Sequence, residues 1–402
     1  MLNKVIGFDN PNEFIKRLVS IGVDYNASDI HITPSKDYVY IRFRISGNLV
    51  SFYGITLEQY EKLLNTIKVR AYMTIDEHNH IQDGKMSFNF KKGEEDLLVN
   101  VRVSVLPTIY GENTVMRLLL SGSKYLDINN LGFSNNTLDR VKNILNMNDG
   151  LVLLCGGTGS GKTTTLYSLL HEFDPITNAV FTLEDPVEYV IDGYVQSEIK
   201  ERKIGDDKVN YTFQEGLVGI LRQDPDIIMI GEIRRGVEAS ICLEAASTGH
   251  IVMGSTHASS AIGAITRLKK LGVEPYLLAS SIKYIIFQKL LRGLCPHCRK
   301  EIILNKNEIP EKFQSYLPLD KNKFYSVNSE GCENCTKGYV GNTLVAEIIQ
   351  NDDDIYNQIL SEGGDIEFNA ILKGKGFIPY YIDALNKAFE GLIDIKDVII
   401  LD

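Results

Sequence analysis

The sequence predicts an α/β protein, with a mixed α+β domain at the N-terminus and a larger domain built on a wound sheet of parallel βαβ units. In the first 120 residues, two segments alternate apolar and polar residues with the period of half-buried strands. From about residue 133, short apolar runs alternate with segments of helical periodicity, as in βαβ units. The chain of 402 residues is also long enough for two or three domains.

The first predicted domain covers residues 1–120. In segment 38–45 every second residue is apolar, which predicts a strand with one buried face, and segment 97–105 repeats the pattern. Gly93, among charged neighbours, predicts the turn before the second of these strands. The polar stretch 121–132 lacks periodicity, so we expect the linker between the domains there.

The second predicted domain covers residues 133–402. Apolar runs predict strands at 151–154, 180–183, 227–230 and 251–255. Helical periodicity predicts helices at 166–173, 213–221 and 237–248. Gly249 directly after the last of these is typical of a helix end. An insertion carrying cysteines is expected over 290–340, followed by a helical region at the C-terminus.

Composition and charge exclude several classes of protein. Lys and Arg total 42 and Asp and Glu total 52, which gives a net charge of −10, so direct binding of nucleic acid is not expected. No apolar stretch approaches the roughly 20 residues that cross a bilayer, and the first residues lack the apolar core of a signal peptide. The expectation is a cytoplasmic protein that reaches a membrane only through a partner.

A phosphate-binding loop follows the first strand of the second domain. The run GGTGSGKT at 156–163 fits G-x-x-x-x-G-K-[ST] and lies between a predicted strand and a predicted helix. Glycines let backbone N–H groups turn toward a phosphate, Lys162 would reach the β- and γ-phosphates, and Thr163 would ligate Mg²⁺. The residues predicted to hold the nucleotide are Gly156, Gly157, Thr158, Gly159, Ser160, Gly161, Lys162, Thr163 and Thr164.

Two acidic sites follow other predicted strands. Glu232 comes after the run 227–230, and Glu184 and Asp185 come after the run 180–183. The carboxyl ends of such strands face the phosphate loop, where a carboxylate can orient the attacking water or hold Mg²⁺ through water. No guanine-reading N/T-K-x-D run follows, so ATP is favoured over GTP.

Two histidines flank the predicted strand at 251–256. His250 and His257 could sense the γ-phosphate or position water. The alternative is that each is a hydrogen-bonded structural residue at a strand end.

Four of the six cysteines form two CxxC pairs. Cys295 with Cys298, and Cys332 with Cys335, have the spacing of two half-sites of a tetrahedral zinc centre. With four thiolate ligands, no coordination position would be left for a catalytic water. Two unconnected reduced pairs or a redox-active pair are the alternatives.

Many runs along the chain together resemble the hexameric secretion ATPases that drive type II secretion and type IV pilus assembly. In the N-terminal part they are ASDIH at 27–31, RFR at 42–44, QDG at 82–84, VRVSVLP at 101–107, GE at 111–112 and VMR at 115–117. In the second part they are the phosphate loop, TLEDPVEY at 182–189, LRQDPDIIMIGEIR at 221–234, TGH at 248–250, STH at 255–257, AITRL at 264–268 and GVEP at 272–275.

The resemblance implies a RecA-like P-loop ATPase core, a PAS-like N-terminal domain and a small zinc-binding insertion. It also implies a homohexamer that works on an inner-membrane platform protein. Glu232 would be the catalytic glutamate, and Glu184 would assist at the Mg²⁺ and the water. The arginines that would contact phosphate across domains or subunits are Arg102, Arg117, Arg234 and Arg267.

Within this family a tetracysteine motif is typical of assembly motors and absent from the retraction branch. Assembly motors usually carry a further N-terminal domain, so this chain is expected to be either a short member or a truncated one. The favoured hypothesis is an ATP-hydrolysing assembly motor. The alternatives are a DNA-uptake motor, a nucleic-acid translocase on the same core, and a regulatory subunit that binds ATP without hydrolysing it.

Overall fold

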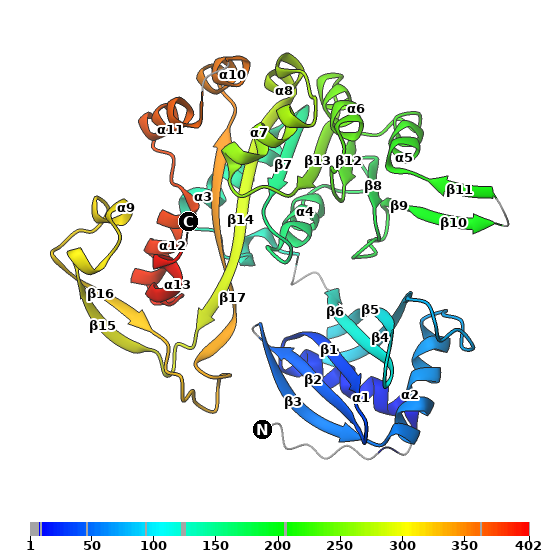
Figure 1. The fold of residues 1–402 in the computed structure, drawn as a ribbon. Coiled ribbons are helices and arrows are strands. Elements are labelled where there is room, and N and C mark those ends of the chain that lie inside the picture. The colour runs from blue at the N-terminus through cyan, green and yellow to red at the C-terminus, as the bar shows by residue number, and fades with distance from the viewer. Residues whose placement is uncertain are drawn as a thin grey trace. The chain divides into compact units, whose positions relative to one another are not determined.

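The computed structural model describes residues 8, 10–45, 47–92, 95–121, 126–204, 207–361 and 364–401 (Figure 1). The chain divides into two compact units, one of residues 1–123 with 329–341 and the other of residues 124–328 with 342–402. The turn predicted at Gly93 and the central part of the predicted linker, residues 122–125, lie outside the described residues.

The first unit is a six-stranded sheet in the order β3-β2-β1-β6-β5-β4, with two helices. Its elements are α1 (Pro11–Asp24), β1 (Ala27–Pro34), β2 (Val39–Ile45), β3 (Asn48–Ile55), α2 (Leu57–Arg70), β4 (Gln82–Lys92), β5 (Glu95–Thr108) and β6 (Gly111–Ser121). Both predicted strands are confirmed as β2 and β5, and their apolar faces are buried with the apolar residues of α1 and α2. The two helices therefore cover the apolar face of the sheet and not its polar face.

The second unit has a seven-stranded sheet in the order β17-β14-β7-β13-β12-β8-β9. Its strands are β7 (Gly150–Cys155), β8 (Val180–Glu184), β9 (Val195–Glu198), β12 (Ile227–Ile230), β13 (Ile251–Thr256), β14 (Ile282–Leu294) and β17 (Tyr339–Gln350). Its helices are η2 (Ile128–Asn130), α3 (Asn135–Lys142), η3 (Asn143–Asn146), α4 (Lys162–His171), α5 (Phe213–Ile220), α6 (Gly236–Ser247), α7 (Ala261–Lys270), α8 (Pro275–Ser281), α10 (Asp353–Leu360), α11 (Asp365–Gly374), α12 (Tyr380–Phe389) and α13 (Ile395–Ile399). A hairpin of β10 (Lys200–Ile204) and β11 (Asp207–Tyr211) and a second small sheet of β15 (Lys300–Asn305) and β16 (Lys321–Ser326), with η4 (Lys306–Glu308) and α9 (Glu311–Gln314), complete it.

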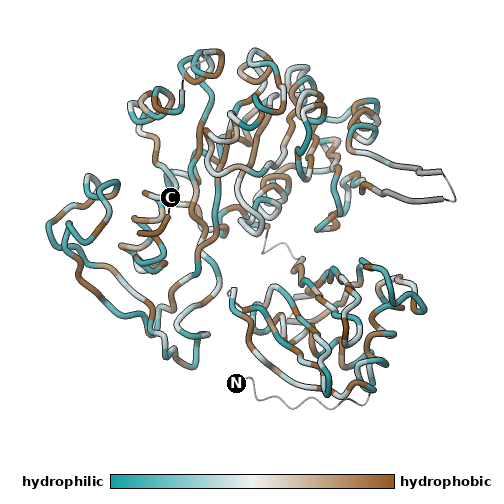
Figure 2. The backbone as a smooth tube through the Cα atoms, in the orientation of Figure 1, coloured by the Kyte–Doolittle hydropathy of each residue, from teal (hydrophilic) through white to brown (hydrophobic). Residues whose placement is uncertain are grey.

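The central strands are buried on both faces. Strands β14, β7, β13, β12, β8 and β9 pair in parallel. Along β7, Leu151 and Leu153 belong to a core with α5–α8, whereas Val152 and Leu154 belong to a core with α4. In Figure 2, β7 and its neighbouring strands have the colour of hydrophobic residues, as expected for a sheet buried between two layers of helices. The RecA-like α/β architecture implied by the resemblance is confirmed.

The predicted strands at 151–154, 180–183, 227–230 and 251–255 are confirmed, but the long strand β14 was not predicted. Its apolar run is interrupted by Gln288 and Lys289, and a strand buried on both faces has no alternating pattern to reveal it. Residues 290–294, expected to open the cysteine insertion, belong to this strand. None of the helices in the described ranges has the length and hydropathy needed to span a bilayer.

Candidate functional site

The phosphate-binding loop connects β7 to α4, as predicted. Gly156, Gly159 and Gly161 have φ values of +151°, +74° and +87°, which L-residues with side chains rarely adopt. Gly161 is the N-cap of α4, so Lys162 is the first residue of the helix and the loop lies at its positive end. Thr163 and Thr164 are half-buried in the first turn of α4.

Lys162 folds back onto its own loop. Its Nζ donates hydrogen bonds to the carbonyl oxygens of Gly156 and Gly157, each at 3.0 Å. Burial lowers the pKa of Lys162, and the nearby Glu232 carboxylate opposes that shift. The ammonium group therefore lies at the loop itself, where it would meet a bound phosphate.

The carboxyl ends of β8, β12 and β13 lie beside the loop because these strands are parallel to β7. In register, Leu183 pairs with Ile230, Ile230 pairs with Gly254, and Thr256 pairs with Cys155. The residues that follow each strand therefore meet at one edge of the sheet. The structure brings Glu184, Glu232 and His257 to this edge, which is what the spacing of the acidic motifs predicts.

Glu232 is held by contacts from two directions. Its Oε1 lies 3.1 Å from Nε2 of His257, whose Nδ1 lies 3.1 Å from the carbonyl oxygen of Gly156. Its Oε2 accepts a hydrogen bond from Nε of Arg234 at 2.9 Å and lies 2.8 Å from Nη2 of the same guanidinium in an ion pair. His257 thus connects the carboxylate to the phosphate-binding loop.

Arg234 also lies near the second acidic motif. Its Nη1 is 3.5 Å from Oδ2 of Asp185, and its hydrogen bond with Glu232 raises the pKa of the guanidinium. Arg267, on α7, donates from Nε to Oγ1 of Thr256 at 3.1 Å. Arg267 also lines a pocket of about 400 Å³ beside His257. Arg234 and Arg267 therefore both lie near the carboxyl ends of β12 and β13. They are the two arginines of the second unit that the resemblance implies for phosphate contact.

Glu184 is almost fully buried, at 2% exposure. Its Oε1 accepts hydrogen bonds from the hydroxyl groups of Tyr167 at 2.6 Å and Thr182 at 2.7 Å. Burial raises the pKa of Glu184, and the two hydroxyl donors oppose the shift because they stabilise the carboxylate. No sequence pattern singles out Tyr167, which occupies an ordinary apolar position of α4.

His250 lies at the other end of β13 and does not reach the loop of its own chain. It precedes the strand, at the edge where Ile251 pairs with Gly150, roughly 20 Å from the loop at about 3.3 Å per residue. Its Nδ1 lies 2.9 Å from the carbonyl oxygen of Ala245, which makes it a hydrogen-bonded residue beside the end of α6. Within this chain, His250 is therefore a hydrogen-bonded structural residue at the end of a strand, which is the alternative that the sequence left open.

Arg102 and Arg117 lie in the first unit, side by side on adjacent strands. Register pairs Arg102 of β5 with Lys85 of β4 and with Arg117 of β6, so the three basic side chains share one face of the sheet. Nε of Arg117 also donates to Oδ1 of Asp29 at 3.0 Å.

A pocket of about 630 Å³ adjoins the phosphate-binding loop. Loop residues 156–160 and His257 line one side of it. The apolar residues lining the remainder come from β14 and the C-terminal region and are Phe287, Leu290, Tyr380 and Ile400. Sequence reasoning missed this side because its residues lie more than 120 positions after the loop.

Glu347 was also missed by the sequence analysis. This carboxylate of β17 is 4% exposed and accepts from the backbone N–H of Ala261 at 2.7 Å and of Tyr380 at 3.0 Å. These are the first residues of α7 and α12, so one buried carboxylate caps two helices whose positive ends stabilise it. Burial nevertheless raises the pKa of Glu347.

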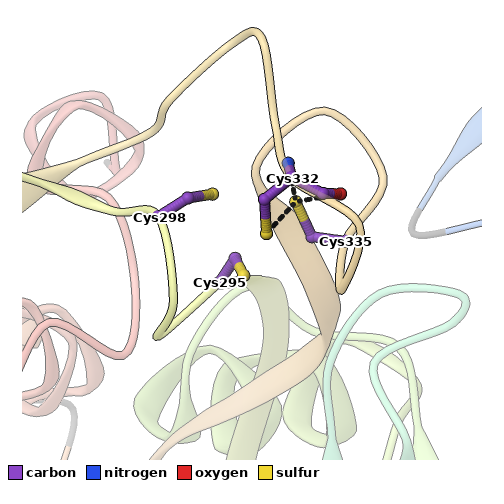
Figure 3. Close-up of side chains that lie close together, drawn as sticks. All are labelled: Cys295, Cys298, Cys332 and Cys335. Atoms are coloured by element: carbon purple, nitrogen blue, oxygen red, sulfur yellow. Dashed lines mark hydrogen bonds between the residues drawn. The ribbon is translucent and has the colours of Figure 1, made fainter.

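The four predicted zinc ligands form one cluster. The sulfur atoms of Cys295, Cys298, Cys332 and Cys335 all lie within 4.8 Å of one another (Figure 3). Sγ of Cys335 accepts from the backbone N–H of Cys332 at 3.1 Å and of Gly338 at 3.3 Å. Such donors stabilise a thiolate, the form of cysteine that binds metal. The cluster therefore fits a tetrahedral zinc centre in number, type and proximity of its ligands.

Comparison with known proteins places the chain among ATPases. The family described as "Type II/IV secretion system protein" matches residues 8–400. The type II secretion system ATPase E of Vibrio cholerae is 34% identical over 387 residues, which make up 96% of this chain and 74% of that protein. The type IV pilus assembly ATPase PilB of Thermus thermophilus is 34% identical over 388 residues, 96% of this chain and 42% of that protein.

The fold is shared with a solved structure. The X-ray structure of the ATPase DotB of Legionella pneumophila matches with a TM-score of 0.67 at 19% identity, covering 99% of this chain and 97% of that one. The resemblance read from the sequence motifs is thereby confirmed. The chain belongs to the family of type II/IV secretion system proteins and is one of its ATPases.

Proposed function

We propose that this chain hydrolyses ATP at the P-loop and uses the energy to assemble pilin-like subunits, in type IV pilus biogenesis or in type II secretion. One observation carries the chemical part of the proposal. Glu232 lies beside the loop, connected through His257 to the carbonyl oxygen of Gly156, so a water-orienting carboxylate and a phosphate cradle share one site.

The loop and α4 would bind the triphosphate. Amide N–H groups of the loop and the positive end of α4 attract phosphate, and Lys162 would move from its loop carbonyls to the β- and γ-phosphates. The Thr163 hydroxyl would ligate Mg²⁺, which neutralises phosphate charge when it is bound with ATP. The apolar side of the 630 Å³ pocket would hold the nucleoside.

The carboxylates would prepare the attacking water. Glu232 orients it, and its pairing with Arg234 and His257 fixes the direction of the carboxylate. Glu184, which accepts hydrogen bonds from Tyr167 and Thr182, would assist at the Mg²⁺ ion and the water. Arg234 and Arg267 would stabilise charge on the phosphates, and their contacts with Asp185 and Thr256 at this edge of the sheet support that role.

At the level of the assembly we propose a homohexamer acting on an inner-membrane platform protein. The proposed domains are residues 1–120, a linker at 121–132 and an ATPase domain at 133–402. Arg102 and Arg117 of the first domain would contact phosphate across a domain or subunit boundary, and hydrolysis would change the angle between the domains. The relatives from secretion and from pilus assembly are equally similar, at 34%, so the proposal covers both machines.

We further propose that the cysteine cluster holds a structural zinc ion. Four thiolates leave no position for water, so the ion would stabilise the loops that carry the cysteines and take no part in hydrolysis. The presence of the cluster favours assembly over retraction, because the resemblance associates the tetracysteine motif with assembly motors.

The first test is the rate of phosphate release from ATP. Lys162→Ala should reduce kcat/KM at least about 100-fold through loss of phosphate binding, and Glu232→Gln should reduce kcat by a similar factor while ATP still binds. The exposed residues Lys16 and Glu244 provide matched controls, since Lys16→Ala and Glu244→Gln remove the same groups at positions that do not line the pocket beside the loop. Equal rates for wild type and Lys162→Ala would refute hydrolysis at this site.

A further inference from the structure

Gln288 contacts the phosphate-binding loop from a strand that lies far along the chain. Strand β14 pairs in parallel with β7, and Phe287 is in register with Cys155, so Gln288 stands beside the start of the loop. The side chain is fully buried, at 0% exposure. Neither the motifs nor the family comparison assign a role to this residue.

Gln288 lies close to three positions of the loop. Nε2 of Gln288 donates a hydrogen bond to the carbonyl oxygen of Ser160 at 2.8 Å. The same nitrogen would lie 3.1 Å from a Cβ at Gly161, and the backbone oxygen of Gln288 would collide with a Cβ at Gly156. One residue of β14 therefore spans the loop from its first glycine to the N-cap of α4.

The hydrogen bond fixes the direction of a peptide group. In a planar trans peptide the C=O and the following N–H point in opposite directions. With the carbonyl of Ser160 held toward Gln288, the N–H of Gly161 is held pointing away from β14. A P-loop binds phosphate through N–H groups, so the direction of each peptide in the loop determines whether it can contribute.

We infer that Gln288 is a positioning residue for ATP binding, which holds the peptide between Ser160 and Gly161 in the orientation that the triphosphate needs. The inference deepens the proposed function and rests on it. A residue that only filled the core would be apolar, whereas Gln288 buries an amide whose Oε1 has no hydrogen-bond partner among the described residues. Burying such an oxygen costs free energy, so the donor group of the same amide must contribute something in return.

The test replaces Gln288 by methionine, which keeps the length and approximate volume of the side chain but has no N–H group. Amides that hold phosphate act in the ground state and in the transition state alike, so their loss raises KM more than it lowers kcat. For Gln288→Met we expect KM for ATP to rise about tenfold, with kcat within about twofold of wild type. Gln288→Glu, whose carboxylate cannot donate and would repel phosphate, should raise KM further.

Gln358 offers a matched control. It is a buried glutamine on α10, at 8% exposure, and it does not line the pocket beside the loop. Gln358→Met should leave KM and kcat unchanged, and the thermal midpoint of each variant reports general damage to the fold. An unchanged KM for Gln288→Met, with or without a lower thermal midpoint, would overturn the inference.

Equilibrium binding separates this inference from the proposed function. The affinity of each variant for a non-hydrolysable ATP analogue is measured in the presence of Mg²⁺. If wild type binds the analogue but does not hydrolyse ATP, the proposed hydrolysis fails while weaker binding by Gln288→Met still supports the positioning role. If Gln288→Met binds the analogue as tightly as wild type, the positioning role fails whatever the turnover.

Discussion

Glu184 shows how single side chains set the chemistry of this site. A carboxylate with 2% exposure would normally prefer its protonated form, and burial does raise the pKa of Glu184. The hydroxyl groups of Tyr167 and Thr182 counteract this by donating to the carboxylate. The charged form, which the proposed role beside Mg²⁺ would require, is therefore stabilised by two neutral neighbours.

This dependence predicts the pH profile of a Tyr167→Phe variant. Removing one donor destabilises the carboxylate, so the pKa of Glu184 rises further. Because the proposed role of Glu184 requires the ionised form, the acidic side of the profile of kcat against pH should move to higher pH. Tyr194, whose hydroxyl donates to the backbone oxygen of Leu170, is the control, and Tyr194→Phe should not shift the profile. Identical acidic sides for Tyr167→Phe and wild type would contradict a catalytic role for Glu184.

At the scale of elements, the sequence contained enough information to place the main strands and their acidic ends. Strands β7, β12 and β13 are short apolar runs, and parallel pairing then determines that Glu232 and His257 lie beside the loop. Residues brought in by non-local pairing could not be predicted. Gln288 meets the loop only because β14 pairs with β7, and no pattern in the sequence specifies that pairing.

The ends of helices could also be predicted, and one of them allows a clean test of stability. Gly249 follows the C-cap of α6 with φ of +98°, and a Cβ there would meet nothing within 4 Å. Gly249→Ala should therefore cost about 1–2 kcal/mol purely from backbone conformation. At Gly219, within α5, an added Cβ would likewise meet nothing within 4 Å, but the φ of this glycine lies outside the left-handed region.

The matched variant Gly219→Ala should accordingly be neutral or stabilising by up to about 1 kcal/mol, because alanine is the better helix former. Urea denaturation of the two variants and wild type measures the difference. Equal free energies of unfolding for both variants would show that the glycine after α6 is not required for its conformation.

At the scale of the whole molecule, the cysteine cluster joins parts of the chain that are distant in sequence. Cys298 and Cys332 are separated by a segment that contains β15, β16 and α9, yet their sulfur atoms lie within 4.8 Å. Closing so long a loop costs conformational entropy, and four unliganded thiols offer little to offset it. The proposed zinc ion would supply that free energy, since it would bind the folded arrangement and not the unfolded chain.

The purified protein should therefore contain one zinc ion per chain by elemental analysis. Cys335→Ser should lose the ion and lower the thermal midpoint, and a strong chelator should lower the midpoint of wild type in the same way.

His297 lies between the first two cysteines but outside the cluster, so His297→Ala should keep both the zinc and the midpoint. Because the proposed ion would take no part in hydrolysis, the initial rate of phosphate release per folded Cys335→Ser chain should stay within about threefold of wild type. Zinc retained by Cys335→Ser, or absent from wild type, would exclude the tetracysteine centre.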